Sequence, residues 1–321
     1  MCDRDVQEST SPPFRYTVLL DVHSRRSMTQ FPWPSIGGVW PTWTGRGFDV
    51  GGQHRRVLDF EAGDSGWSQA LTRFHEDTAG QGTHPIDVAS RQRARAALRR
   101  HLKTRPADAV ILEVGCSSGF LLRELVSDWP ESLVIGSDFI VEPLERLAEQ
   151  APTLPLMRFD MVKCPLPPAS VDAIVLLNVL EHIDDDARAV GQVARVLKQG
   201  GVAVVEVPAG PGLYDVYDKY LRHYRRYRLQ ELCELLERAG LRVASRSHLG
   251  FLLYPAFALV KRRNRRWLDE PEDVQRAVVE RSIKQTGRGP LLRWATTIES
   301  VGARWLSYPV GIRCLAVAVK L

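Results

Sequence analysis

Ala109-Val-Ile-Leu-Glu-Val-Gly-Cys-Ser-Ser-Gly-Phe120 is an apolar, β-branched run that leads directly into small residues. A short run of this kind bounded by glycine predicts a strand buried on both faces, as in a parallel sheet. The residues from Gly115 to Gly119 carry little side-chain bulk, so a ligand can approach the backbone amides that open the next helix. Ligands of open α/β sheets bind at this edge. The segment therefore predicts a nucleotide-like cofactor at the carboxyl end of a parallel strand.

The glycine spacing separates two classes of nucleotide site. The dinucleotide fingerprint is G-x-G-x-x-G, whereas here Ser117 stands between Gly115 and Gly119, and Phe120 takes the last position. This spacing argues against an NAD(P)-dependent reductase. The segment instead resembles motif I of the class I S-adenosylmethionine-dependent methyltransferases, E/D-x-G-x-G-x-G, with Glu113 as the acid and Ser117 in place of the middle glycine. A tight strand-to-helix turn that binds no ligand is the structural alternative.

The next apolar run also ends in an acid. Leu133–Asp138 closes 23 residues beyond Gly115. A carboxylate about 20 residues after the glycine loop, at the end of the second strand, suits the two ribose hydroxyls of an adenosine. The alternative is an exposed acid where a strand meets its loop. We expect Asp138 to bind the ribose.

Three further apolar runs complete a series of alternating strands and helices. Residues 156–160, 171–177 and 201–207 predict the third, fourth and fifth strands. Leu180-Glu-His-Ile-Asp-Asp185 resembles the L-E-H-I-D-D signature of small-molecule methyltransferases, and Leu197-Lys-Gln-Gly-Gly201 resembles their L-K-P-G-G turn. The order of these segments strengthens the resemblance.

The resemblance to class I methyltransferases covers residues 90–210 closely. It implies a Rossmann-like three-layer α/β sandwich, in which a mostly parallel seven-stranded sheet has an antiparallel last strand. It also implies S-adenosyl-L-methionine as cofactor, with an acid beside the adenine amino group and the following residue against the ring. The cofactor-binding residues that it implies are Glu113, Gly115, Cys116, Ser117, Gly119, Asp138, Phe139, Asp160, Met161, Asn178 and Glu181.

The chain divides into four expected segments. Residues 1–84 form an N-terminal extension, and residues 85–248 form the cofactor-binding core. Residues 249–310 form a helical cap that is inserted before the last strand of the core, residues 311–321. The sixth and seventh strands of the resembling family would then pair across this insertion.

The N-terminal extension has a weak pattern. Residues 31–52 are rich in glycine, proline and tryptophan and predict a loop-rich cover. Residues 56–60 predict a short strand, and residues 65–75 and 86–102 predict helices, with Pro85 in the first turn of the second. The tryptophans are expected to pack or to belong to a lid, with an aromatic substrate pocket as the alternative.

Composition fits a soluble enzyme without a metal centre. Hydrophobic residues make up 44% of the chain and charged residues 25%, near globular averages. The five cysteines are scattered and form no C-x-x-C pair, which supports neither a disulfide framework nor a zinc site. The sequence shows no signal peptide and no apolar run near the ~20 residues of a spanning helix. We therefore expect a cytoplasmic protein with reduced thiols and no metal.

Residues 214–227 are expected to face the substrate. Their five tyrosines recur every three or four residues, as on one stripe of a helix. The segment resembles the G-H-x-R-R-Y segment of bacterial small-molecule methyltransferases, with Arg222 where glycine is usual. Most of the tyrosines fit a core face, so Tyr214, His223 and Arg225 are the candidates for contact with substrate.

Methyl transfer from a sulfonium requires mainly that acceptor and methyl be held in line. No metal or nucleophilic side chain is needed for it. If the acceptor is a hydroxyl, a base assists the loss of its proton, and His182 and His223 are the candidate catalytic residues because histidine titrates near neutrality. A structural role for either histidine is the alternative.

One region of the chain is strongly basic, which indicates partners that carry negative charge. Residues 215–267 contain 13 Lys and Arg residues against five Asp and Glu, which favours an anionic or lipid-linked small-molecule acceptor. Residues 249–266 join a short apolar run to Lys261-Arg-Arg-Asn-Arg-Arg266, typical of peripheral contact with an anionic membrane, here at its inner face. An ordinary lid helix is the alternative. The sequence predicts no oligomeric state.

The leading function is methyl transfer to a small molecule at oxygen. An RNA methyltransferase that uses the basic region is an alternative, although no N-P-P-Y motif or Pro-Cys nucleophile pair accompanies it. A catalytically inactive module that binds the cofactor is another. Nothing in the sequence indicates DNA binding.

Overall fold

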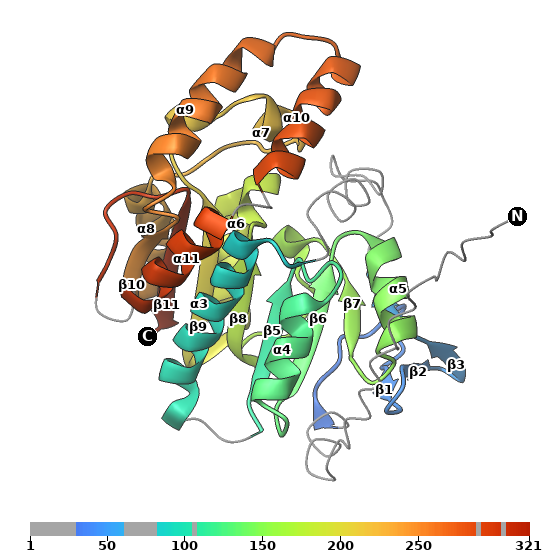
Figure 1. Ribbon diagram of the computed structural model, residues 1–321. Helices are drawn as coiled ribbons and strands as arrows, with labels where there is room; N and C mark the ends of the chain where they lie inside the picture. Colours follow the sequence, from blue (N-terminus) through green and yellow to red (C-terminus); the bar gives the residue numbers. More distant parts are fainter. Residues whose placement is uncertain (1–29, 61–81, 105–107, 287–289, 303–305) are drawn as a thin grey trace, which may run out of the picture.

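An eight-stranded sheet runs through the centre of the protein, in a computed structural model that describes residues 30–60, 82–104, 108–286, 290–302 and 306–321 (Figure 1). Its strand order is β10-β11-β9-β8-β5-β6-β7-β4. Neighbouring strands pair in parallel except at β11, which is antiparallel to both β9 and β10. The expected Rossmann-like class is therefore confirmed. The strands are β4 (Val57–Asp59), β5 (Val110–Val114), β6 (Leu133–Asp138), β7 (Leu156–Arg158), β8 (Val171–Leu177), β9 (Leu197–Pro208), β10 (Leu241–Leu249) and β11 (Arg313–Lys320).

The expected number of seven strands is wrong, because the N-terminal region adds an eighth. The strand expected over residues 56–60 forms β4, which pairs in parallel with the outer edge of β7 through the register Val57–Leu156. The amide of Phe60 continues the pairing to the carbonyl of Arg158 at 2.9 Å. Leu58 is fully buried. An edge that would otherwise expose unpaired backbone groups is thus covered by the chain's own N-terminal region.

Alternate residues of the buried strands face two different layers, which explains the uninterrupted apolar runs in the sequence. On β5, Ile111 packs toward one layer, whereas Val110 and Leu112 pack toward the other. Together with the sheet these make the expected three layers. The first layer holds α3 (Pro85–His101), α4 (Phe120–Asp128) and α5 (Val141–Gln150), and the second holds α6 (Asp186–Val196) and α8 (Leu229–Arg238).

The segment expected as loop-rich contains β1 (Thr42–Trp43) and β2 (Phe48–Val50), which form a small antiparallel sheet with β3 (Gln53–Arg55) just beyond it. Trp33 and Trp43 both pack edge-to-face on Phe48, with ring centroids 4.9 and 4.8 Å from it. These aromatic rings join the core cluster under the second helical layer. The packing role expected for the tryptophans is confirmed at these two positions. The helix expected over residues 65–75 lies outside the described residues.

Helices fill the insertion before β11. Helices α9 (Tyr254–Asn264) and α10 (Glu272–Thr286) stand with α7 (Val216–Tyr220) at one end of the sheet, whereas α11 (Pro290–Gly302) returns to pack on α3 (Figure 1). The domain boundaries stay a prediction. Among the described helices, none combines the length and the apolar content that a membrane span requires.

The helix expected over residues 214–227 is wrong beyond its first turns. α7 ends at Tyr220, and Arg222 takes a left-handed backbone angle (φ 54°). The amide of His223 then bonds back to the carbonyl of Asp218 at 2.8 Å. From there the chain runs as a loop beside the end of β9, where Tyr227 forms an isolated bridge with Ala209. The tyrosines have the spacing of a helix, but the helix ends before the left-handed residue Arg222.

Candidate functional site

The loop after β5 can be built only with glycine at two positions. Gly115 and Gly119 have left-handed φ angles of 75° and 71°, which side chains strain. A Cβ atom at Gly115 would lie 2.6 Å from Val179 Cγ2, and one at Gly119 would lie 2.7 Å from Leu147 Cδ1. The loop therefore keeps its backbone bare at the carboxyl end of the central strand, where a ligand can approach it.

Asp138, at the end of β6, holds this loop. Its Oδ2 atom accepts from the amide of Ser117 at 2.9 Å, and its Oδ1 atom accepts from the amide of Ile140 at 2.9 Å. Ser117 itself has a left-handed φ of 41°, so this hydrogen bond stabilises serine where the resembling motif has glycine. A carboxylate has about four acceptor sites in all, so this type of side chain can accept from hydroxyl groups of a ligand as well as from backbone amides.

A buried carboxyl group lies at the base of the loop. Glu113 is 6% exposed, and its Oε2 atom has no hydrogen bond to another described residue. Burial raises the pKa of Glu113 well above its usual value. Burial also raises the pKa of Cys116 well above that of a free thiol, so Cys116 is suited to packing and not to nucleophilic attack. Glu113 is a ready partner for a cationic group of a cofactor.

The remaining expected cofactor residues lie at the ends of β6, β7 and β8. Asp160 accepts from the amide of Val162 at 3.0 Å and caps the short turn η2 (Met161–Lys163). Met161 is buried, and the guanidinium of Arg158 lies 5.8 Å from the ring of Phe139. Asn178 follows β8 with a left-handed φ of 56°. The structure thus brings these residues to one edge of the sheet, and their contact with a cofactor stays a prediction.

Three side chains gather just beyond β8. Glu181 and His182 belong to the short turn η3 (Leu180–His182), and His223 comes from the loop after α7. One potential ligand atom from each lies within 4.8 Å of the others, and the two imidazole rings meet edge-to-face at 4.6 Å. Glu181 is fully buried with no hydrogen bond from either oxygen to another described residue, and burial raises its pKa to about 8. The two candidate catalytic histidines are therefore neighbours.

His223 is oriented by a carboxylate that the sequence analysis did not select. Its Nδ1 atom lies 2.9 Å from Asp218 Oδ1. Burial alone would raise the pKa of Asp218, but the charges of Lys261 and Arg226 hold it well below the usual value. Burial lowers the pKa of His223. The neutral ring therefore donates through Nδ1 to an ionised carboxylate, which leaves the lone pair on Nε2.

The family model described as a methyltransferase domain matches residues 87–246. This match spans the glycine loop, Asp138 and the η3 turn. The chain belongs to the class I S-adenosylmethionine-dependent methyltransferases.

Two curated relatives agree with this family. A probable S-adenosylmethionine-dependent methyltransferase of Mycolicibacterium smegmatis is 34% identical over 116 residues, which cover 34% of this chain and 44% of the relative. Trans-aconitate 2-methyltransferase of Azoarcus sp. is 32% identical over 119 residues, 36% of this chain and 46% of the relative. The chain thus spans less than half the length of these relatives.

The fold is shared with solved structures. A candidate sarcosine dimethylglycine methyltransferase of Galdieria sulphuraria superposes with a TM-score of 0.52 at 16% identity, over 78% of this chain and 98% of that chain. At this identity the likeness concerns the fold alone.

The expected substrate residues of this methyltransferase have partners within the chain. The hydroxyl of Tyr214 donates to the carbonyl of His223 at 2.9 Å. Arg225 donates to the carbonyl of Asp184 at 2.7 Å and pairs with Asp186 at 2.8 Å. Both side chains thus hold the loop after α7 against its surroundings, and their contact with substrate stays a prediction. Asp185 caps the start of α6 by accepting from the amide of Arg188 at 2.9 Å.

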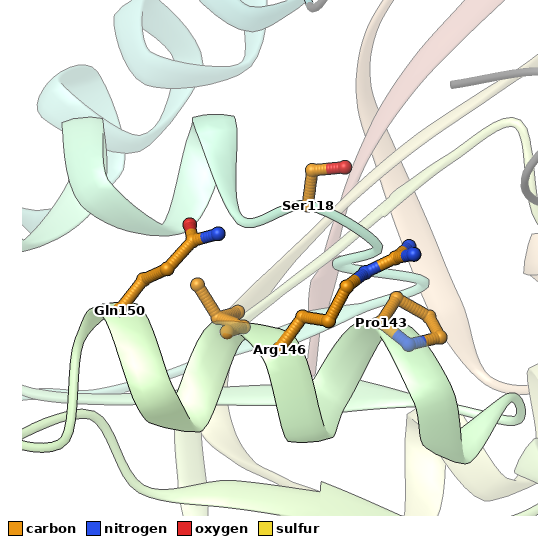
Figure 2. A pocket seen from close by; sticks show the side chains of 5 residues that line it. Ser118, Pro143, Arg146 and Gln150 are labelled. Atoms are coloured by element: carbon orange, nitrogen blue, oxygen red, sulfur yellow. The ribbon is translucent and has the colours of Figure 1, made fainter. Parts of the chain in front are cut away.

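A hollow of about 40 Å³ lies on the outer side of the glycine loop. Figure 2 shows Ser118 of the loop above Pro143, Arg146 and Gln150, three side chains along α5. Its volume is below the about 300–1,000 Å³ of typical ligand pockets. The strand ends, with their bare backbone and their carboxylates, therefore define the candidate site of the methyltransferase better than this hollow does.

Proposed function

We propose that the protein transfers a methyl group from S-adenosylmethionine to a small-molecule acceptor, at oxygen. Family membership supports the reaction class. The observation that carries it is the pairing of a bare glycine loop with Asp138, at the ends of two adjacent parallel strands. Glu113, whose buried Oε2 atom lacks a partner among the described residues, adds a negative group for a cationic cofactor. These residues fit S-adenosylmethionine.

Each of these residues has a separate role in the proposal. Asp138 accepts hydrogen bonds from the ribose hydroxyls while it holds Ser117 in place, and Asp160 and Met161 bind the adenine. When bound, the cofactor supplies a methyl group activated by a positive sulfur. The chain then has to hold the acceptor in line with that methyl, exclude water and assist the loss of the acceptor's proton.

His182 and His223 carry the acceptor side of the proposal. An oxygen acceptor has to lose its hydroxyl proton during transfer, and these adjacent imidazoles lie beyond the end of β8. Asp218 positions His223 for this role. An anionic acceptor fits the basic residues that follow, and one curated relative is named for trans-aconitate, a small organic acid. Tyr214 and Arg225 remain candidates to contact the acceptor.

Contact with a membrane surface is a second proposal, and it rests on α9 and the turn before it. Leu252, Leu259 and Val260 are exposed, with 48%, 70% and 47% of their surface accessible. The exposed Arg262 and Arg263 follow them on the same helix. Apolar side chains beside arginines suit the interface of an anionic bilayer at the cytoplasmic face. A lipid-linked acceptor would then be reached from that surface.

One experiment tests the reaction class. The protein is incubated with methyl-labelled S-adenosylmethionine and a panel of small carboxylic and hydroxy acids, and with cell extract, and labelled products are identified by mass spectrometry. We expect label in a small-molecule ester or ether and none in nucleic acid. Label in RNA would contradict the acceptor class. Absence of cofactor binding in calorimetry would contradict the whole proposal.

A further inference from the structure

Three side chains of metal-binding type meet beyond the end of β8. Glu181, His182 and His223 each place a potential ligand atom within 4.8 Å of the other two. Two imidazoles and one carboxylate form the donor set of catalytic Zn²⁺ sites and of non-haem Fe²⁺ sites. We propose that these three residues bind a divalent transition-metal ion. The sequence analysis expected no metal, and this proposal departs from that expectation.

Glu181 supplies the strongest argument for a cation. Its side chain is fully buried, and neither oxygen makes a hydrogen bond to another described residue. A buried polar group without a partner is costly, and a buried carboxylate more so unless it is paired or bound to a metal. Both oxygens are therefore available as ligands. An ion at this place would offset the cost of burying the acid.

His223 is prepared as a ligand by its neighbours. Metal-bound histidines almost always donate their second ring N–H to a carboxylate or carbonyl, which fixes the tautomer. Here Nδ1 of His223 lies 2.9 Å from Asp218, and Asp218 in turn accepts from Arg226 at 2.8 Å and from Lys261 at 3.0 Å. Nε2 is left to bind the ion, with the ring held by a fixed carboxylate.

The backbone keeps the two halves of the site together. The amide of Tyr224, next to His223, donates to the carbonyl of Glu181 at 2.8 Å. The amide of His182 closes the η3 turn onto Val179 at 3.0 Å. Ligand atoms around Zn²⁺ at 2.0–2.1 Å are roughly 3.4 Å from one another. The three ligand atoms, now within 4.8 Å of one another, would have to approach that spacing when an ion binds.

The ion would act on the acceptor of the methyl group, and this part of the inference rests on the proposed function. Three protein ligands leave at least one coordination position open. An acceptor hydroxyl bound there would lose its proton to water more easily, because a divalent cation stabilises the oxygen anion. His182 and His223 would then assist deprotonation through the ion and not as free bases.

Metal binding is tested without the methyl-transfer reaction. The chelator-treated full-length protein is titrated with Zn²⁺ at neutral pH in calorimetry, and its Co²⁺ form is examined by visible absorption. We expect one ion per chain and a Co²⁺ spectrum typical of nitrogen and oxygen ligands at low coordination number. Glu181→Gln and His223→Asn should each weaken Zn²⁺ binding by more than about 10-fold, the loss that even an outer-shell partner causes. His101→Asn, at the far end of α3, is the matched control and should bind normally.

The outcomes separate this site from the proposed function. Calorimetry with S-adenosylmethionine on wild type and His223→Asn should show equal cofactor affinity, so loss of metal binding and loss of cofactor binding are measured independently. Equal Zn²⁺ affinity in wild type, Glu181→Gln and His223→Asn would overturn the site, as would no binding at about 1 mM Zn²⁺. If a variant fails to fold by circular dichroism, the Co²⁺ spectrum of the wild type decides, and a spectrum of free aqueous Co²⁺ overturns the proposal.

Discussion

Lys261 of the inserted helix α9 lies 3.0 Å from Asp218, the carboxylate that orients His223. The same ammonium group lies 2.6 Å from Asp215, and all three of these ionic side chains are buried. The insertion is therefore connected to the candidate site through a buried network of charges. A change in α9 can reach His223 without touching it.

Loss of Lys261 should destabilise the protein. In Lys261→Met two buried carboxylates lose their shared cation, and breaking a buried pair on one side costs about 3–5 kcal/mol. Urea denaturation measures the free energy of unfolding of wild type and variant. The control Arg262→Met, at the exposed neighbouring residue, should change the free energy of unfolding by less than about 0.5 kcal/mol. Equal stability of the two variants would show that the network is not formed.

Loss of Asp138 should abolish most cofactor binding. Asp138→Ala removes two proposed hydrogen bonds to the ribose, each worth about 1.5–3 kcal/mol when the acceptor is charged. Calorimetry with S-adenosylmethionine should show an affinity at least about 100-fold lower. Asp108→Ala, at an exposed aspartate just before β5, is the control. Unchanged affinity in Asp138→Ala would refute the assignment of the ribose.

Two of the three left-handed positions of the loop, Ser117 and Gly119, should respond differently to substitution. Gly119→Ala places a methyl group against Leu147 at a φ of 71°, which costs about 1–2 kcal/mol for the backbone alone. Ser117→Gly relieves a similar strain and should change stability by less than about 1 kcal/mol. Thermal unfolding of both variants checks the pair. A stable Gly119→Ala protein would mean that the loop adopts another conformation.

Acid should weaken the contact between α3 and α4. Hydrogen bonds from Arg95, at 2.6 and 2.8 Å, and from Arg99 lower the pKa of Asp128 below its usual value. The pKa of Asp128 is lower in the folded protein than in the unfolded chain. The stabilisation is therefore fully present above the ordinary aspartate pKa of about 3.9. It is lost as the pH falls through the pKa of the folded protein. Asp128→Asn lacks it at every pH. The stability difference between wild type and variant should shrink from pH 7 toward acid; a constant difference in thermal unfolding would contradict the pairing.

The α9 surface should bind anionic vesicles. Flotation with phosphatidylserine-containing liposomes should carry the protein at low salt and release it at high salt, because exposed charges are screened. Leu259→Asp should reduce flotation by removing an exposed apolar side chain and adding a negative charge. Flotation on neutral lipid alone would exclude the electrostatic mechanism.

Local signals explain which parts of the fold could be predicted. The run at 109–120 specifies a buried strand, a left-handed turn and a helix start through adjacent residues, and the structure contains all three. The cap at Asp185 is equally local. The tyrosine spacing predicted a helix that is too long, because spacing gives no sign that Arg222 takes a left-handed backbone angle. The sequence predicted the short strand at residues 56–60 but did not assign it to the central sheet, so the expected strand count was one too low. Neither the sequence of this strand nor that of β7 shows that the two pair.

The sequence alone was sufficient for the family, the mostly parallel sheet and the edge at which the candidate cofactor residues gather, because their motifs lie in short apolar runs and the turns between them. It did not reveal the environment of the acceptor side. Asp218, which orients His223, is paired with two buried cations, and one of them, Lys261, lies 43 residues further along the chain. Folding buries the carboxyl group of Glu181 where neither of its oxygens makes a hydrogen bond to another described residue. Contacts between distant segments and burial arise when the layers pack, so only the folded chain shows them.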